Sequence, residues 1–326
     1  MKKIYVLIFL LIAIFMFMLL TYKDNKKKSK DLDTIKLAEV THSVFYTPLY
    51  VAIENNYFRE NKIDIDLILT SGADKVSAAV LSKDVNIGFA GLESAMYVYE
   101  GGEKDYLKAF SGLTKRDGQF IVGRVNSYNF SLEDLKGKEI LVGRKGGMPA
   151  LNFINALKNE GIDINDVNIN YQIDFASLGG AFIGGTGDYV NLFEPTVTLL
   201  SKDANLYNLL PIGKYSGEMP YTVFYARKSF IEKNKDLINR FNDAIDKGLE
   251  YTLNNNSKDI AKVISSQFPD ISINDLTKMI DNYKNADSWI SNHNISKSSY
   301  NNLEQLLISN NLIKNPIPFN KIVVNE

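Results

Sequence analysis

The stretch "IKLAEVTHSVFYTPLYVAIENNYFRENKIDIDLIL", residues 35–69, is the part of the sequence that indicates the fold. It begins with a β-rich run at 35–40 and ends with another at 63–69, and residues 49–58 between them have a helical pattern. A strand, a helix and a second strand in this order are typical of parallel α/β proteins. Ligands bind such sheets outside the carboxyl ends of the strands, so the loop at 41–46 is a candidate site.

The same alternation continues along the chain. Further β-rich runs lie at 85–91 and 106–113, with helical stretches at 74–81 and 92–99. Between residues 125 and 219 the pattern repeats with "KEILVG", "VNINYQI", "GDYVNLF" and "YNLLPIG". Beyond residue 229, apolar residues keep a helical spacing, as in Ile238, Phe241, Ile245 and Leu249. We therefore expect an α/β fold whose C-terminal part is helical.

The length of the chain favours two lobes. A single hydrophobic core stops growing at roughly 250 to 300 residues, and this chain has 326. Two similar stretches, "FIVGR" (120–124) and "VFYAR" (223–227), are extended, apolar and end in arginine. A chain that leaves one lobe and returns to it needs two crossing segments, and these stretches are the candidates. The prediction is a first lobe of residues 35–122 plus 224–326, and a second lobe of residues 123–223.

Composition excludes several kinds of function. The formal net charge is −1, which provides no overall attraction for nucleic acid. The chain has two histidines, His42 and His293, and no cysteine. Zinc cages, thiol catalysis and disulfides are therefore disfavoured. We expect no metal, no cofactor and no catalytic residue.

The N-terminus indicates an association with a membrane. Lys2 and Lys3 precede an uninterrupted apolar run at 4–20 that is longer than the roughly 7 to 15 residues of a usual signal core. No small-residue cleavage site follows it, so residues 1–22 are predicted to be an uncleaved anchor and 23–34 a lysine-rich tether; a buried helix of a soluble protein is the alternative. The lysines after the run outnumber those before it, and this count by itself would place the body in the cytoplasm.

The stretch "GRKGGMPALNFI", residues 143–154, is the first candidate binding feature. It lacks the lysine and the hydroxyl residue of a phosphate loop, because Met148 and Pro149 follow the last glycine. It fits instead a turn from a strand into a helix whose N–H groups face a ligand. Two cations could then bind an anion or a carbonyl, or could simply be solvated. The candidate residues of this turn are Arg144, Lys145, Gly146 and Gly147.

Two carboxylates follow predicted strands at matching places in the two lobes. Glu194 comes after the run at 188–193, where it could accept two N–H bonds from an aminopyrimidine or simply stabilise the start of a helix. Glu93, with Gly91, occupies the corresponding place in the first lobe and has the same two interpretations.

Aromatic residues follow the first predicted strand. Phe45 and Tyr46 could stack on a flat ligand, and Thr41 or His42 could form a hydrogen bond with it. A structural role is the alternative for His42, since no catalytic partner stands near it in the sequence. Two further tyrosines complete the predicted ligand-binding set, namely Tyr189 and Tyr221.

These stretches resemble the substrate-binding proteins of ABC importers, in the nitrate/sulfonate/taurine and thiamine-pyrimidine-precursor family. The resemblance covers residues 35–319 and depends on "EVTHSVFYTPLYVAIENNYF", "DVNIGFAGLESAMYV", "LEDLKGKEILVGRKGGMP", "GAFIGGTGDYVNLFEP" and "MPYTVFYARKSFIEKN". It implies a type II periplasmic-binding-protein-like fold, in which two lobes, each a mixed sheet flanked by helices, are joined by two crossing hinge strands and close on a ligand.

The resemblance also implies a function and a location. The chain would be a monomer that captures a small solute, makes or breaks no bond, and delivers the solute to a membrane permease and its ATPase. The body would then lie on the extracytoplasmic face, which overrides the lysine count. The family pattern is not followed at "LLTY", which stands where a lipid-bearing cysteine is usual, so the apolar segment itself would have to tether the protein.

The sequence leaves the ligand open between two classes. If Glu194 and the aromatic residues face the cleft, a thiamine-pyrimidine precursor is favoured; if Arg144 and Lys145 dominate, a sulfonate or nitrate-type anion is favoured. We prefer the pyrimidine. A two-lobed extracytoplasmic sensor domain is the alternative function, and an enzyme similar to pyrimidine synthases is disfavoured because those use a cysteine cluster.

Overall fold

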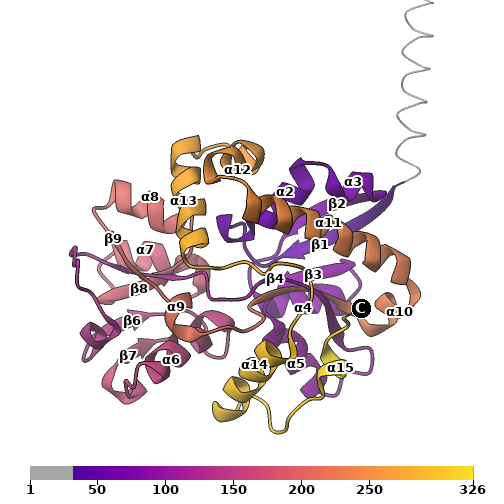
Figure 1. Ribbon diagram of the computed structural model, residues 1–326. Helices are drawn as coiled ribbons and strands as arrows, with labels where there is room; N and C mark the ends of the chain where they lie inside the picture. The colour runs from indigo at the N-terminus through magenta and orange to yellow at the C-terminus, as the bar shows by residue number, and fades with distance from the viewer. Residues whose placement is uncertain (1–31, 326) are drawn as a thin grey trace, which may run out of the picture.

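The computed structural model describes residues 32–325, which form two five-stranded sheets flanked by helices (Figure 1). The first sheet has the order β2-β1-β3-β10-β4, in which β1, β2 and β3 are parallel and β10 is antiparallel to its neighbours. Its strands are β1 (Asp33–Glu39), β2 (Ile63–Leu69), β3 (Ile87–Ala90), β4 (Leu107–Thr114) and β10 (Thr222–Arg227). Strand β1 pairs with β2 from Asp33 with Ile63 to Glu39 with Leu69, which confirms the parallel unit predicted at 35–69.

The second sheet has the order β7-β6-β8-β5-β9, and it too mixes parallel and antiparallel pairs. Its strands are β5 (Phe120–Gly123), β6 (Glu139–Leu141), β7 (Asn168–Asn170), β8 (Tyr189–Leu192) and β9 (Tyr207–Pro211). Two mixed sheets with flanking helices confirm the predicted α/β, two-lobed fold class. Figure 1 shows the first sheet on the right and the second on the left.

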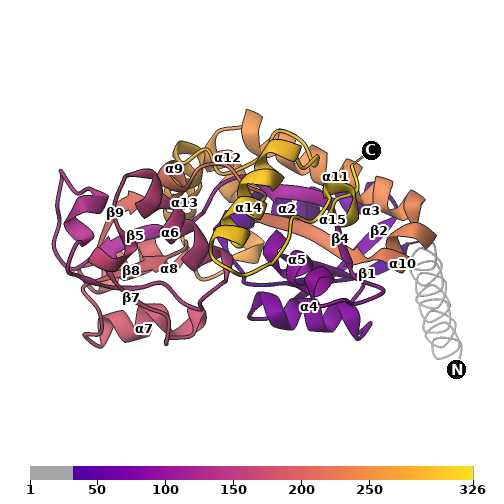
Figure 2. The ribbon, with the colours of Figure 1, turned by 90° about the horizontal axis from the view of Figure 1, so that it is seen from below.

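The helices near the cleft follow the strands, as expected for α/β units. They are α2 (Thr47–Glu54), α3 (Tyr57–Glu60), α4 (Ala73–Leu81), α5 (Leu92–Glu100), α6 (Met148–Asn159), α7 (Leu178–Ile183) and α8 (Thr196–Asp203). The helical stretch predicted at 49–58 is broken between α2 and α3, because Asn56 has a left-handed φ of 61°. Figure 2 shows α4 and α7, one from each lobe, on the same side of the molecule.

The C-terminal part is helical, as predicted. After the short α9 (Gly213–Ser216) and β10 come α10 (Lys228–Lys233), α11 (Lys235–Asn254), α12 (Ser257–Ile264), α13 (Ile273–Asn285), α14 (Lys297–Ser309) and α15 (Phe319–Ile322). The apolar stripe predicted for α11 packs inward, since Phe241, Ile245 and Leu249 are fully buried. One hydrophobic cluster includes residues of both lobes, and a smaller one covers the other face of the second sheet.

The crossings between the lobes do not coincide with the predicted ones. Strand β5, which contains most of "FIVGR", lies wholly in the second sheet, and β10, which contains "VFYAR", lies wholly in the first. The chain therefore crosses at 115–119 and 217–221, just before each strand. The prediction erred because extended apolar residues are equally suited to a buried strand and to a connection. We propose lobe boundaries that follow these connections.

The first connection contains a buried carboxylate. Asp117 is 1% exposed and accepts hydrogen bonds from the N and Nε2 of Gln119, at 2.5 and 2.9 Å. Burial raises the pKa of Asp117 to about 7, and the hydrogen bonds from Gln119 lower it by less.

The predicted membrane anchor at 1–22 and most of the tether lie outside the described residues. Within residues 32–325, the structure has no helix that is both long enough and apolar enough to span a membrane.

Candidate functional site

A cavity of about 520 Å³ lies between the carboxyl ends of the two sheets. The first lobe lines it with the loops that follow β1, β2 and β3, and the second lobe with the loops that follow β6 and β8 and with the start of α7. Tyr221 and Thr222 line it where the second connection meets β10. Loops at the carboxyl ends of parallel strands thus supply both walls, as expected for this kind of sheet.

Most of the predicted site residues line this cavity. They are Thr41, His42, Tyr46, Gly91, Glu93, Arg144, Gly147, Glu194 and Tyr221. These residues are far apart in the sequence, and they come together because each follows a strand of one of the two sheets or lies on a connection.

Four predicted residues are not part of the cavity lining. Phe45 is fully buried, and its ring packs against Phe193, Tyr221 and Tyr283. Tyr189 begins β8, so it lies at the far end of that strand from the cavity. Lys145 is exposed outside the lining, and Gly146 is buried. The expected ring stacking by Phe45 on a ligand is therefore wrong: this ring belongs to the core beneath the cavity.

The stretch "GRKGGMPALNFI" forms the expected turn from a strand into a helix. Gly143 and Gly146 have φ values of 80° and 79°, a left-handed backbone that favours glycine. Helix α6 then begins with Pro149 in its first turn and with Gly147 as its N-cap, and its first turn holds no acidic residue. The carboxylate nearest this helix start comes from the other lobe, because the backbone N–H of Met148 interacts with Glu93.

The two cations of this turn have different positions. Arg144 is exposed and lines the cavity, whereas Lys145 does not. The guanidinium lies close enough to the carboxylate of Glu93, in the other lobe, to lower its pKa. Of these two cations, Arg144 is the one that could contact a ligand in the cavity.

Glu93 brings a buried carboxylate to the cavity. Glu93 is 1% exposed, and among the described residues its Oε2 atom has no hydrogen-bond partner. Burial raises the pKa of Glu93 to about 7, while the charge of Arg144 and nearby backbone N–H groups, including that of Met148, lower it by less. A Cβ on Gly91 would lie 1.9 Å from Oε2 and 2.6 Å from Cγ of Met148, so only glycine fits between them. An unpaired buried oxygen is costly, and a donor on a ligand would satisfy it.

Glu194, in contrast, is fully used by the protein. It is 0% exposed, its Oε2 accepts a hydrogen bond from the N of Thr198, and its Oε1 accepts bonds from Thr198 Oγ1 and Asn282 Nδ2, each at 2.9 Å. Burial raises its pKa, and these hydrogen bonds lower it by less. Of the two interpretations, the structure supports a carboxylate that stabilises the start of α8. Both carboxylate oxygens of Glu194 already accept hydrogen bonds from the protein, so neither is free to accept the two N–H bonds that were expected from an aminopyrimidine.

His42 also has its polar atoms engaged. Its Nδ1 lies 2.7 Å from Oε1 of Glu39, and its Nε2 lies 2.9 Å from the carbonyl oxygen of Gln267. The pKa of His42 is raised, because the hydrogen bond and the charge of Glu39 together outweigh burial. Each ring nitrogen of His42 faces an acceptor oxygen, and this arrangement suits the imidazolium form, in which both nitrogens carry a proton. His42 contributes a surface to the cavity, but both its nitrogens are already bound.

Several cavity residues were not among the predicted ones. Phe193 is 8% exposed and packs edge-on against Phe175, which is 37% exposed. Lys75 lies just inside α4, after the loop that follows β2. Residues 174–180, which include the start of α7, have no comparable signal in the sequence, because the strand before them, β7, is only three residues long.

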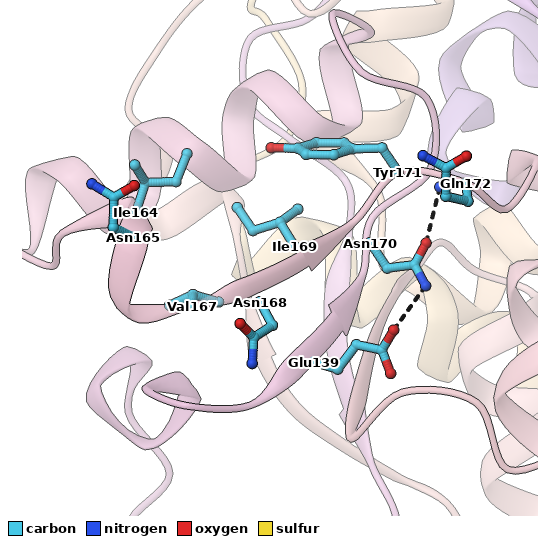
Figure 3. A pocket seen from close by; sticks show the side chains of 9 residues that line it. All are labelled: Glu139, Ile164, Asn165, Val167, Asn168, Ile169, Asn170, Tyr171 and Gln172. Carbon is cyan, nitrogen blue, oxygen red and sulfur yellow. Dashed lines mark hydrogen bonds between the residues drawn. The ribbon is translucent and has the colours of Figure 1, made fainter.

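A second concavity, of about 810 Å³, lies along the edge strand β7 (Figure 3). Its amide groups are paired within the protein: Asn170 Nδ2 donates to Glu139 Oε1 at 2.8 Å, and the N of Gln172 donates to Asn170 Oδ1 at 2.9 Å. None of the predicted residues lines it. The cavity between the lobes is therefore the better candidate site. Within residues 32–325, no group of three or more histidine or carboxylate side chains is placed to hold a metal ion.

Comparison with known proteins agrees with this geometry. Residues 44–258 match the family model described as "NMT1/THI5 like". The chain belongs to the NMT1/THI5-like family. The match covers the second sheet, the strands of the first sheet other than β1, and the cavity lining beyond residue 43.

Individual relatives of this NMT1/THI5-like chain are found among sequences and structures. A binding protein of Bacillus subtilis (strain 168), YtlA, is 36% identical over 301 residues, which cover 92% of this chain and 90% of the relative. The alkanesulfonate-binding protein SsuA from Xanthomonas axonopodis pv. citri, bound to MOPS, superposes with a TM-score of 0.71 at 14% identity, covering 90% of this chain and 98% of that one.

A third relative has the same fold. The ligand-binding component of an ABC-type import system from Staphylococcus aureus superposes with a TM-score of 0.71 at 15% identity, covering 90% of this chain and 97% of that one. At these identities the structural likeness establishes the two-lobed fold of the NMT1/THI5-like chain and leaves the ligand undetermined.

Proposed function

We propose that this NMT1/THI5-like protein is the solute-binding component of an ABC importer. Three findings support the proposal: the family membership, the two-lobed fold shared with binding proteins, and a cavity between the lobes that is large enough for a small solute. The protein would hold the solute and release it to a permease without making or breaking a bond.

The ligand class that the cavity supports best is a flat nitrogen heterocycle with N–H donors, such as an aminopyrimidine precursor of thiamine. The observation that carries this proposal is the unpaired Oε2 of Glu93, buried in the wall of the cavity. A carboxylate can accept two N–H bonds from an aminopyrimidine. The proposal keeps the predicted ligand class and moves the acceptor from Glu194 to Glu93.

Aromatic side chains support the same class. Tyr46, Phe193 and Tyr221 line the cavity and are at most 8% exposed, so their rings have fixed positions. Phe175 stands at the mouth. Rings in fixed positions suit a planar aromatic ligand. A stacked or edge-on aromatic pair contributes about 0.5–1.5 kcal/mol beyond the free energy gained by burying its surface.

A sulfonate or similar anion is the second candidate, and Arg144 is the observation that favours it. Its exposed guanidinium lines the cavity beside the start of α6, and a protonated Glu93 would leave the charge of Arg144 and the helix dipole to an anion. Charge-assisted hydrogen bonds from arginine to a sulfonate are worth roughly 1.5–3 kcal/mol each.

Titration calorimetry on the full-length chain in detergent distinguishes the two classes. We expect an aminopyrimidine to bind in the micromolar range, as is usual for such solutes at roughly −8 kcal/mol, and Glu93→Gln to weaken it about tenfold or more. Binding of an alkanesulfonate alone would overturn the proposed class. In that case Arg144→Ala should abolish binding, while the matched variant Lys145→Ala, which removes a cation outside the lining, should not.

The cellular setting is part of the proposal. The body would lie on the extracytoplasmic face, tethered by the N-terminal apolar segment, as a monomer working with a permease and its ATPase. Protease added to intact cells should then remove the body; complete protection until lysis would place it in the cytoplasm. Genes for a permease and an ATPase beside this one support transport, whereas a neighbouring sensor kinase would favour a two-lobed sensor.

A further inference from the structure

Three residues of the first lobe converge on one residue of the second. Ser43 Oγ donates a hydrogen bond to the carbonyl oxygen of Glu194 at 2.5 Å, and the N of Glu194 donates to the hydroxyl of Tyr283 at 2.9 Å. Asn282 Nδ2 donates to Oε1 of Glu194 at 2.9 Å. The backbone donor, the backbone acceptor and the side chain of Glu194 are thus all bound across the boundary between the lobes.

Glu194 is equally well fixed inside its own lobe. Thr198 N and Oγ1 both donate to its carboxylate, and the residue is 0% exposed. Buried polar groups with all their partners are rigid, because separating them in a low-dielectric interior leaves each one unsatisfied. This junction therefore resists separation more than a solvated contact would.

Two of the three converging residues belong to α13, and α13 is anchored in the first lobe. The ring of Tyr283 packs 5.1 Å from that of Phe45 and 6.1 Å from that of Trp289. Trp289 Nε1 in turn donates to the carbonyl oxygen of Phe45 at 2.8 Å. Helix α13 also packs along α12, which lies against α2. Figure 1 shows α13 between α12 and the second lobe.

Two other contacts between the lobes are more exposed to solvent. On the α5 side, the hydroxyl of Tyr97 donates to the carbonyl oxygen of Gly146 at 2.7 Å, and Tyr97 is half-buried. Between α8 and α13, Lys202 and Asp275 form an ion pair at 2.8 Å, in which the lysine is 57% exposed. Ion pairs exposed to solvent contribute only about 0–1 kcal/mol to stability. The junction at Glu194 is thus more deeply buried than these two contacts.

We propose that α13 is a third connection between the lobes, centred on Glu194, and that the lobes rotate about this junction and the two crossing segments. Opening then separates α4 from α7, which lie together on one side of the molecule (Figure 2). Asn282, Tyr283 and Ser43 are positioning residues, since they hold Glu194 and with it Phe193, the adjacent wall of the cavity. The influence of these residues on a bound ligand rests on the proposed function. The rotation of the lobes does not depend on it.

The chain offers a clean experiment because it contains no cysteine. Spin labels attached through Ala78→Cys on α4 and Ile183→Cys on α7 report the distance across the mouth by pulsed dipolar spectroscopy. Both positions are exposed, and neither lines the cavity. The full-length labelled chain is measured in detergent without any ligand, so the result does not depend on which solute the cavity binds.

We expect one narrow distance distribution for the labelled wild type. Asn282→Ala should add a population with a longer distance across the mouth, and Ser43→Ala should act in the same direction. Thr198→Val removes a hydrogen bond to Glu194 inside the second lobe only, and Lys202→Ala removes the exposed ion pair. Neither of these two controls should change the distribution.

Two outcomes overturn the proposal. One is an unchanged distribution in Asn282→Ala and Ser43→Ala, which would mean that the junction does not hold the lobes. The other is equal broadening in Thr198→Val and Asn282→Ala, which would mean that α8 itself is loosened. Thermal melts followed by circular dichroism identify any variant that fails to fold, and Asn282→Gln, which keeps the amide donor, should restore the distribution of the wild type if the hydrogen bond is the cause.

Discussion

The pH dependence of ligand binding should identify what Glu93 does. Burial raises the pKa of this carboxyl to about 7 from its ordinary value of 4.5. At pH 5, two units below that pKa, the protonated form outnumbers the carboxylate by about a hundred to one. A ligand that donates N–H bonds to the carboxylate must first remove the proton, which costs about 2.7 kcal/mol at pH 5.

The sign of the effect depends on the class of ligand. An aminopyrimidine selects the ionised form, so its affinity should rise roughly a hundredfold from pH 5 to pH 8, most of it below pH 7. An alkanesulfonate selects the protonated form, since a second negative charge repels it. Its affinity should be constant below pH 7 and should fall by up to about tenfold per pH unit above it.

Titration calorimetry of the wild type and Glu93→Gln across this range is the assay. The amide does not ionise, so the variant reports the titration of the ligand and of the other cavity groups, among them His42 and Glu194, whose pKa values are also raised. Tyr46, Tyr97 and Tyr221 stay neutral throughout, because burial raises the pKa of each. The ratio of the two affinities isolates Glu93. Parallel pH curves for the two proteins would refute the reasoning.

The remaining predictions concern stability and the mouth of the cavity. Phe175→Ala should weaken binding of an aminopyrimidine roughly tenfold by calorimetry while leaving the melting temperature almost unchanged, because this ring is 37% exposed; equal losses in both would make its role structural. Gly91→Ala should lower the free energy of unfolding by about 1–3 kcal/mol, since the new Cβ would lie 1.9 Å from Oε2 of Glu93. Gly180→Ala is the control in denaturant unfolding, because nothing lies within 4 Å of its Cβ position. Because the folded pKa of Glu93 is raised, its contribution to stability is present below pH 4.5 and is lost as the pH rises towards 7. The melting temperature of Glu93→Gln relative to wild type should therefore increase from pH 5 to pH 8, and a constant difference would contradict the raised pKa.

Much of the architecture was predictable because it depends on local patterns. The β-rich runs and helical stretches alternate with recognisable periods, and loops at the carboxyl ends of strands could be placed without knowing how the lobes pack. The error at the crossings arose because the apolar stretches "FIVGR" and "VFYAR" were assigned to the crossings, whereas the connections are the neighbouring segments "KRDGQ" and "GEMPY". The actual crossings at 115–119 and 217–221 are decided by pairing with strands far away in the sequence.

The candidate site was predictable only as a set of loops. Phe45 and Tyr46 are adjacent aromatic residues after the same strand, yet one ring enters the core and the other lines the cavity. Arg144 and Lys145 are adjacent cations in the same turn, and only Arg144 lines the cavity. No pattern in the sequence separates the members of either pair, because the direction of each side chain follows from the packing of the opposite lobe.

The sequence by itself predicted an α/β fold with two lobes and candidate binding loops after the strands, and it favoured Glu194 over Glu93 as the carboxylate for a ligand. Only the tertiary structure decided between these two carboxylates. Asn282, 88 residues further along the chain, joins Thr198 in binding Glu194 and leaves it no free oxygen. Glu93 is buried against Gly91 and Met148 with Oε2 unpaired. Hydrogen-bond partners supplied by distant segments therefore distinguish two carboxylates that follow strands in the same way.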